Sequence, residues 1–375
     1  MDLSQTYSPF RSVLLREWRR MTSRRLYFGV CIVLPLFTLF FMATIFGNGQ
    51  MENIPIGIID QDNTATSRAI TRNISAVPTF KVVKHYVNEA AAREAVQKKE
   101  IYGYLSIPPR FEQNAITGKN ATLSYYYHYA LLSVGGELMA AFETSLAPVS
   151  LSPIIMEAVS LGADQQQITT FLLPVQANNH PIYNPSLDYS VYLSQPFFFV
   201  LFQVLILLTT VYTVGIEIKF RTATDWLATA KGNMITAVLG KLLPYTFIYI
   251  LIGWLGNYVM FGILHIPFQG SWWLINMITV LFVIATQALG LFIFSLFPAV
   301  SLVISVVSMV GSLGATLSGV TFPVSNMYPL VRDASYLFPV RHFTEMIQTM
   351  LYGGGGFIYL WPSMVILCIF PLLAL

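Results

Sequence analysis

The sequence of 375 residues contains very few charged side chains. Asp, Glu, Lys and Arg make up 10% of it, whereas a soluble globular protein carries about 25%. Hydrophobic residues account for 55%, and the mean hydropathy is +0.61. Residues 242–331 contain no Asp, Glu, Lys or Arg at all. This shortage of charge excludes a soluble enzyme and predicts an integral membrane protein.

The sequence also lacks the residues from which catalytic and energy-converting sites are usually built. Its two cysteines, Cys31 and Cys368, lie in apolar runs, so neither a disulfide framework nor a metal-ligand spacing is available. No phosphate loop of the form G-x-x-x-x-G-K-[S/T] is present, because Gly240-Lys241 is followed by Leu242. The apolar runs hold no pair of carboxylates for a proton relay. We therefore expect no catalysis, metal or cofactor on this chain, and any energy for transport must come from a partner.

Six apolar runs are long enough to cross a membrane. Spanning about 30 Å of hydrocarbon takes roughly 20 helical residues. The runs cover residues 26–46, 192–216, 237–263, 272–297, 300–320 and 357–375. The first run is too long for the apolar region of a signal peptide and is interpreted as a retained span. The sequence thus predicts a polytopic α-helical membrane protein with six transmembrane helices.

The basic residues predict the orientation. Six of them precede the first run: Arg11, Arg16, Arg19, Arg20, Arg24 and Arg25. Since basic loops stay on the cytoplasmic side, both chain ends and the loop 217–236 are expected in the cytoplasm, and the polar block 47–190 is expected to be exported. A merely solvated basic face is the alternative interpretation of the cluster. The net charge of +3 is too small to indicate nucleic acid as a partner.

The block 47–190 alternates strand and helix patterns. Strands are expected over 54–60, 80–86, 101–107 and 123–128, and helices over 64–75, 88–96 and 133–173. This alternation predicts a small α/β layer. The expected domain plan is a cytoplasmic amphipathic helix over 1–25, a first transmembrane helix over 26–46, an inserted extracytoplasmic α/β domain over 47–190, and transmembrane helices two to six over 191–375.

The loop after the second predicted span carries a helix-start signal. Thr222-Ala-Thr-Asp225 has the [S/T]-x-x-[D/E] pattern of a capping box, and Gly232 is a natural helix stop. A short helix over about 222–232 should therefore display Trp226 and Leu227 beside charged residues. Such a helix is too short to be stable alone, so it needs a groove in which to dock. An amphipathic loop resting on lipid headgroups is the alternative.

Three sets of residues resemble one family. Glu217, Thr222, Leu227 and Gly240-Lys241-Leu-Leu-Pro244 are similar to the signature around the coupling helix of type-2 ABC transporter permeases, the membrane subunits of ABC exporters. This sequence departs from the pattern at Arg221, where the family often has Gly, and at Ala230, where Pro is common.

The other two sets lie on either side of this loop. Gly319-Val-Thr-Phe-Pro323, Met327-Tyr-Pro329 and Pro339-Val-Arg-His-Phe343 resemble the stretch before the family's last span, in which two short helices dip into the outer leaflet. Asp60-x-Asp-Asn-x-x-x-Ser67, Ile101-x-Gly103, Ile107-Pro-Pro-x-Phe111 and Gly118 resemble the large periplasmic domain of the drug-efflux branch.

The resemblance implies partners and a transport role. It implies a second permease copy or a homologue, and a separate ABC ATPase subunit that binds ATP and Mg. The branch also suggests a periplasmic adaptor protein, and the expected setting is the lipid of the bacterial inner membrane. The function implied is export of an amphipathic or hydrophobic substrate. Two alternatives stay open: an ion-driven secondary transporter, which the charge-free stretch 242–331 disfavours, and a membrane-tethered receptor, for which a single span would suffice.

The resemblance also implies site residues. Those expected to couple to the ATPase are Glu217, Lys219, Arg221, Thr222, Asp225, Trp226, Leu227 and Lys231. Among them, Trp226 and Leu227 are the expected apolar anchors, and the charged residues would set the register. A re-entrant outer gate is expected over 321–345, with Pro323, Met327, Pro329, Arg332, Pro339 and Arg341. An ordinary exposed loop is the alternative there. Residues that either line the path or join helices by hydrogen bonds are Gln203, Asn257, Asn276 and Gln287.

Overall fold

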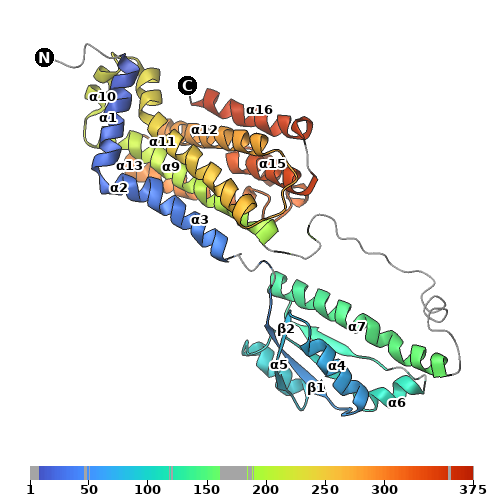
Figure 1. Cartoon of the computed structure of the whole chain (residues 1–375). Helices are drawn as coiled ribbons and strands as arrows, with labels where there is room; N and C mark the ends of the chain where they lie inside the picture. The colour runs from blue at the N-terminus through green and yellow to red at the C-terminus, as the bar shows by residue number, and fades with distance from the viewer. Residues whose placement is uncertain are drawn as a thin grey trace. The chain divides into compact units, whose positions relative to one another are not determined.

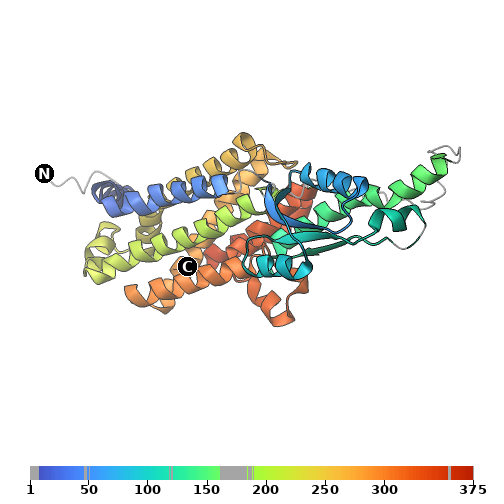
Figure 2. The same cartoon turned by 90° about the horizontal axis from the view of Figure 1, so that it is seen from below.

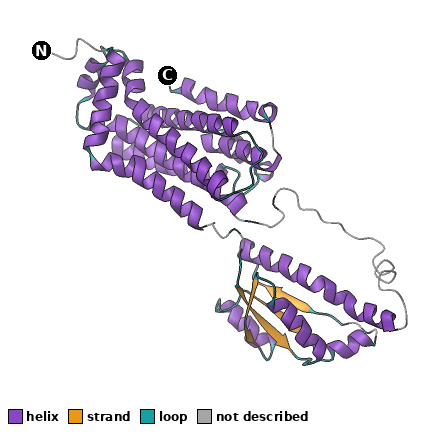
Figure 3. Ribbon diagram, in the orientation of Figure 1, coloured by secondary structure: helices purple, strands orange, loops and turns teal. Residues whose placement is uncertain are grey.

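The structure is a computed structural model that describes residues 8–45, 49, 51–117, 119, 121–160, 184, 188, 190–353 and 356–374. The chain divides into two compact units, one comprising Met1–Gly49 with Pro181–Leu375 and the other comprising Gln50–His180. Figures 1 and 3 show that the first unit is built of helices and that the second combines helices with a sheet. Each unit is described by itself.

The first unit is a helical bundle. In chain order its helices are α1 (Pro9–Ser23), α2 (Arg25–Phe28), η2 (Gly29–Val33), α3 (Leu34–Ile45), η3 (Ser190–Ser194), α9 (Gln195–Lys219), α10 (Ala223–Thr229), α11 (Met234–Asn257), η4 (Tyr258–Ile263), α12 (Trp272–Leu296), α13 (Val300–Leu317), η5 (Val324–Asn326), α14 (Pro329–Ser335), α15 (Pro339–Gly353) and α16 (Phe357–Leu373).

Five of the described helices are long and apolar enough to cross a membrane. They cover Arg25–Ile45, Ser190–Lys219, Met234–Ile263, Trp272–Leu296 and Val300–Leu317. The sequence predicted a sixth span over 357–375, where the structure has α16. This helix is apolar but has 17 residues, which corresponds to about 26 Å, somewhat less than the hydrocarbon thickness.

Helix α9 lies inside the bundle in both views (Figures 1 and 2), and most of its residues are buried. An aromatic cluster joins it to the helices around it: the ring centroids of Phe199 and Phe343 are 4.1 Å apart, and those of Phe282 and Phe343 are 4.7 Å apart. Gly253 permits α11 to approach α12 closely, because a Cβ there would lie 2.5 Å from Cγ2 of Thr279. Packing of this kind fixes the relative positions of helices in lipid, where the hydrophobic effect does not hold them together.

The second unit is built on a four-stranded sheet with the order β2-β1-β3-β4. Strand β1 (Ile54–Asp60) is parallel to β2 (Phe80–His85) and β3 (Gly103–Ile107), and β4 (Ser124–Tyr127) is antiparallel to β3. The central strand β1 is almost entirely buried, as expected of a parallel strand covered on both faces.

Helices cover both faces of this sheet. Apolar residues of α4 (Ala65–Ser75) and α7 (Leu132–Ser160) share one core with Ile56 and Ile58, and those of α5 (Glu89–Gln97) share another with Ile59. The helical stretch predicted over 133–173 corresponds to α7, and its last part lies outside the described residues.

The aspartate motif after β1 builds the loop that joins these elements. Asp60 accepts hydrogen bonds from the backbone N–H groups of Asp62 and Asn63 and from the hydroxyl of Ser67, at 3.0, 2.9 and 2.7 Å. The carboxylate of Asp62 accepts from the first N–H groups of α6 (Phe111–Ile116). Thus the motif caps a helix and closes a turn.

Candidate functional site

Helix α1 presents an unusual buried face to the bundle. Its buried residues are Val13, Glu17 and Met21, spaced four apart and therefore on one side of the helix. Gly240 allows this side to approach α11, since a Cβ there would lie 3.0 Å from the side chain of Val13. A carboxylate in the middle of such a face needs a partner, because a buried unpaired charge is very costly.

Lys241 of α11 is that partner. Its Nζ lies 2.7 Å from Oε2 of Glu17 and 2.8 Å from Oε1 of Glu217, and all three side chains are at most 1% exposed. The hydroxyl of Tyr245 donates to the second oxygen of Glu17 at 2.8 Å. One lysine thereby bridges two carboxylates from helices α1 and α9.

Glu217 has three further donors. Arg16 binds it with two nitrogens, Nη1 to Oε1 at 2.9 Å and Nη2 to Oε2 at 3.1 Å, which is the strong two-pronged form of this pair. Arg20 and the hydroxyl of Thr222 also donate to it. We call Glu17, Glu217, Lys241, Arg16 and Arg20 the ionic cluster. It joins the N-terminal helix to the ends of α9 and α11.

The short helix α10 is tied to this cluster from its inner side. Trp226 is 4% exposed, its indole N–H donates to the backbone oxygen of Ala237 at 3.2 Å, and Nζ of Lys241 lies 5.3 Å from its ring centroid. Trp226 belongs to an apolar cluster with Val211 and Val303, and Leu227 is half-buried against that cluster. Trp226 therefore holds α10 to its own chain. The sequence suggested that this ring projects outward as an anchor for a partner, whereas in the structure residues of the same chain cover it.

Two other sequence-based expectations for this loop differ from the structure. Thr222 does not cap α10 with its side chain, because its hydroxyl donates to Glu217 instead. The carboxylate of Glu217 is not exposed but is buried in the ionic cluster. The helix itself is shorter than predicted, covering Ala223–Thr229.

The exposed charged residues around α10 are Lys219, Arg221, Asp225 and Lys231. Arg221 has φ +56° and Lys231 has φ +52°, a left-handed conformation that glycine adopts most easily. The departure from the family's glycine at Arg221 thus falls where a left-handed turn leaves α9. The backbone conformation thus fixes where Arg221 and Lys231 lie, one at each end of α10.

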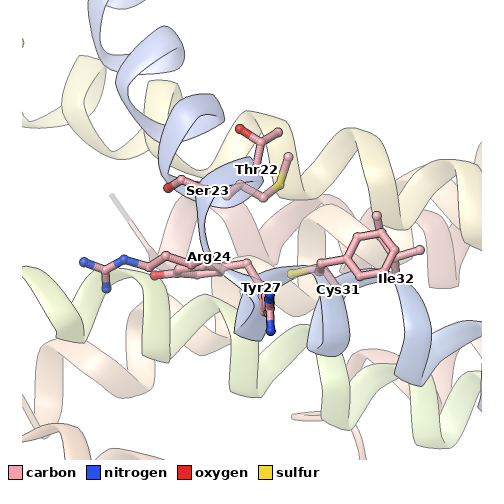
Figure 4. Close-up of a pocket in the computed structure, with 9 residues that line it drawn as sticks. Thr22, Ser23, Arg24, Tyr27, Cys31 and Ile32 are labelled. Carbon is pink, nitrogen blue, oxygen red and sulfur yellow. The ribbon is translucent and has the colours of Figure 1, made fainter.

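The connection between α1 and the first span surrounds a cavity of about 510 Å³. Figure 4 shows Thr22 and Ser23 at the end of α1 and Tyr27 and Cys31 on the span that follows. The ring of Tyr27 packs between those of Tyr212 and Tyr245, with centroids 5.9 Å apart in both pairs. Arg24 is extended and interrupts the helix between α1 and α2. Aromatic contacts of Tyr27 beside the ionic cluster therefore hold the start of the span in place.

The residues expected in a gate are only partly brought together. Pro323, Arg332 and Arg341 line one cavity of about 490 Å³. Pro329 and Pro339 instead occupy the first positions of α14 and α15, where a missing N–H costs nothing. Met327 directly follows η5 and is not among the residues that line this cavity.

The four polar residues of the spans form hydrogen bonds between helices. Gln203 accepts from the backbone N–H of Val340 at 2.9 Å. Asn257 donates to Asn276 and to Thr279 at 3.2 and 3.0 Å. Gln287 accepts from the hydroxyl of Thr246 at 2.7 Å. Of the two readings left open by the sequence, joining helices is the one these contacts support.

Two features of the structure were not predicted from the sequence. Glu17 and Lys241 were not recognised as a pair, although a glutamate among arginines at helical spacing from Val13 was a signal. Helix α13 also carries a row of exposed serines, Ser301, Ser305, Ser308 and Ser312, at helical spacing. Three of their hydroxyls donate to carbonyl oxygens of α13 itself. Among the described residues, no group of three or more His, Cys, Asp or Glu could hold a metal ion.

Comparison with known proteins identifies the family. Residues 25–375 match the model of the ABC-2 family transporter protein. Over 122 residues, 32% of each chain, the sequence is 29% identical to a probable multidrug ABC transporter permease, YbhS, of Escherichia coli (strain K12). Over 109 residues, 28% of each chain, it is 30% identical to the inner membrane transport permease YhhJ of the same strain. The similarity to these curated relatives thus spans about a third of their length. Because the family match covers nearly all of the sequence, this chain belongs to the ABC-2 family of transporter proteins.

Proposed function

We propose that the chain is the membrane subunit of an ATP-driven exporter that moves an amphipathic or hydrophobic substrate out across the bacterial inner membrane. A separate ABC ATPase would bind ATP and Mg and dock against α10. The observation that carries this proposal is the ionic cluster, which joins the region of α10 to α1, α9 and α11 through buried charges. A displacement of α10 would then move two membrane spans.

The surface that would meet the ATPase comprises part of the residue set expected from the sequence, without Trp226 and Glu217. It consists of Arg221, Asp225 and Lys231 around α10, together with Lys219 and the exposed ring of Phe220 at the end of α9. Three of the four charges are positive, so a complementary groove on the partner would be acidic. Trp226 and Glu217 lie beneath this surface and would hold α10, which presents these residues, in position.

The exposed face of α13 supports a second copy of the chain, or a homologue, as a further partner. Ser305, Ser308 and Ser312 lie on it beside Met309 and Leu313, which are 57% and 46% exposed. A row of hydroxyls gains little from contact with lipid tails, whereas small polar residues are favoured where transmembrane helices meet. In a pair of permeases, this face would line the path between the two copies.

The N-terminal helix supports the proposed orientation. Trp18 and Phe10 are 44% and 39% exposed on α1, and Arg11 and Arg19 are exposed as well. Tryptophan and arginine together are typical of a helix that lies at a membrane surface. With this surface in the cytoplasm, the α/β unit would be exported, where an adaptor protein could bind it.

Co-expression with the cognate ATPase tests the proposal. We expect the purified chain alone to hydrolyse no ATP, and the complex to hydrolyse ATP in a vanadate-sensitive manner. Reconstituted into vesicles, the complex should move a lipophilic dye only when ATP is on the ATPase side. ATP hydrolysis by the chain alone, or dye movement driven by a proton gradient without ATP, would contradict it.

A further inference from the structure

The cavity beside α14 and α15 has the features of a binding site. It has a volume of about 490 Å³, and its walls come from η3, the end of α13, η5, α14 and α15. The side chains that give it its chemistry are Tyr192, Ser318, Arg332, Tyr336, Arg341 and Glu345. Two cations and one carboxylate therefore line it.

Arg341 is the central group because it is buried and incompletely paired. It is 6% exposed. Its Nη1 donates to Oε2 of Glu345 at 2.8 Å, and its Cζ lies 5.4 Å from the ring centroid of Tyr336. Its Nε is buried and has no hydrogen-bond partner among the described residues. A buried donor without an acceptor is costly, and the cost is greater on a charged group.

The carboxylate of Glu345 does not supply an acceptor for Nε of Arg341. Oε2 of Glu345 is shared, since it also accepts from the hydroxyl of Ser363 at 3.0 Å. The Nε edge of a guanidinium, like the edge formed by its two Nη atoms, can bind two oxygens of one planar or tetrahedral anion side by side. The unpaired Nε therefore indicates a ligand with at least two acceptor oxygens.

Arg332 adds a second positive charge from another helix. It is 46% exposed, and its Nε is 3.5 Å from Oδ1 of Asp333, which is 70% exposed. An ion pair so open to solvent is weak and leaves the guanidinium available. The stretch 321–345, which contains Arg332 and Arg341, also exposes apolar side chains: Phe322 is 50% exposed and Leu330 is 74% exposed. Anion-binding groups thus lie on a segment that also exposes apolar side chains.

We propose that this cavity binds the phosphate or carboxylate headgroup of an anionic amphiphile. Arg341 would hold two headgroup oxygens through its Nε edge, Arg332 would supply long-range attraction, and the apolar side chains of the segment would contact the hydrocarbon. The site needs neither ATP nor an ATPase, so it is testable whether or not the proposed transport function holds.

The test uses the full chain purified in a neutral detergent and titrated with short-chain phosphatidylglycerol, phosphatidylcholine or inorganic phosphate. Binding is followed by native mass spectrometry and by the shift in melting temperature. We expect phosphatidylglycerol to bind and phosphatidylcholine to bind much more weakly. Inorganic phosphate should compete only at far higher concentration, because it lacks the hydrocarbon. Equal binding of both lipids would overturn the proposal, and tight binding of inorganic phosphate would show a site for a free anion instead.

Matched variants separate two-pronged hydrogen bonding by the guanidinium of Arg341 from simple charge attraction. Arg341→Gln and Arg341→Lys should both weaken phosphatidylglycerol binding by at least about tenfold, because neither side chain has the parallel N–H donors of a guanidinium. Arg332→Gln should weaken it by a smaller factor, and Arg68→Gln on α4 should leave it unchanged. Full binding by folded Arg341→Gln would refute the assignment. If that variant fails to fold, the two-lipid comparison and Arg332→Gln still decide the question.

Discussion

The ammonium group of Lys241 lies 2.7 Å from a carboxylate oxygen of Glu17, although 224 positions separate the two residues in the sequence. Both side chains are almost completely buried. Glu217 accepts from the same ammonium group, so a single lysine joins three helices. Burial makes each charge in this arrangement dependent on the others.

Lys241→Met should destabilise the helical unit strongly. It leaves Glu17 without its cation in a buried site, and removal of one partner from a buried ion pair costs about 3–5 kcal/mol. We expect a marked fall in the melting temperature of the detergent-purified chain, together with increased proteolysis of α1. In the variant that carries both Glu17→Gln and Lys241→Met, the loss should be smaller than the sum of the two single losses, because no uncompensated charge remains on this pair.

The chain offers a matched control for this prediction. Glu94 and Lys98 form an ion pair at 2.7 Å on α5, but both side chains are more than half exposed. Exchanging Lys98 for Met should hardly change the melting temperature, because exposed pairs contribute little. Equal effects at Lys98 and Lys241 would show that the ionic cluster has no special role in stability.

Helix α10 allows a separation of folding from docking. Trp226→Ala removes a buried ring and an indole hydrogen bond, and should cost about 3–5 kcal/mol of stability. The double variant Arg221→Glu and Lys231→Glu should leave the melting temperature nearly unchanged but weaken association with the ATPase by about tenfold or more, with a strong dependence on salt. Surface plasmon resonance of the two purified proteins measures the association and its salt dependence, and a thermal melt of each variant measures its stability.

The control for docking is Lys98→Glu, which reverses one positive charge on α5 of the other compact unit. It should leave ATPase binding intact. Unchanged binding by the α10 double variant, at low as well as high salt, would remove α10 from the docking surface.

Features set by local properties of the sequence could be predicted, whereas features set by contacts between residues far apart in the sequence could not. Five of the spans follow from runs such as 237–263, because length and hydropathy are local properties. The role of Trp226 could not be predicted, because an aromatic residue beside charges looks the same whether its ring faces a partner or Ala237. Helical spacing from Val13 places Glu17 on one face of its helix, but its pairing with Lys241 depends on how three helices pack, which the spacing does not specify.

Gln203 provides a third prediction about how the helices are held together. Its side chain accepts from the backbone N–H of Val340 at the start of α15. Gln203→Leu leaves that buried N–H without an acceptor and should cost about 1–3 kcal/mol. The comparison is Gln287→Leu, which should cost less, because the hydroxyl of Thr246 also donates to the backbone oxygen of Leu242 at 3.0 Å. The two melting temperatures, measured side by side, check the order; the reverse order would contradict it.

The serine row of α13 gives a direct test of how two copies meet. In a chain with Cys31→Ala and Cys368→Ala, which has no other cysteine, we expect Ser305→Cys or Ser308→Cys to form a disulfide-linked dimer in membranes after mild oxidation. Two cysteines bridge only when their Cα atoms come within about 7 Å, so a crosslink places α13 of each copy at the interface. Ile369→Cys on α16, 45% exposed, is the control and should stay monomeric, because in this arrangement α16 faces lipid. Crosslinking at residue 369 without crosslinking at 305 or 308 would assign the interface to α16 and remove α13 from the path.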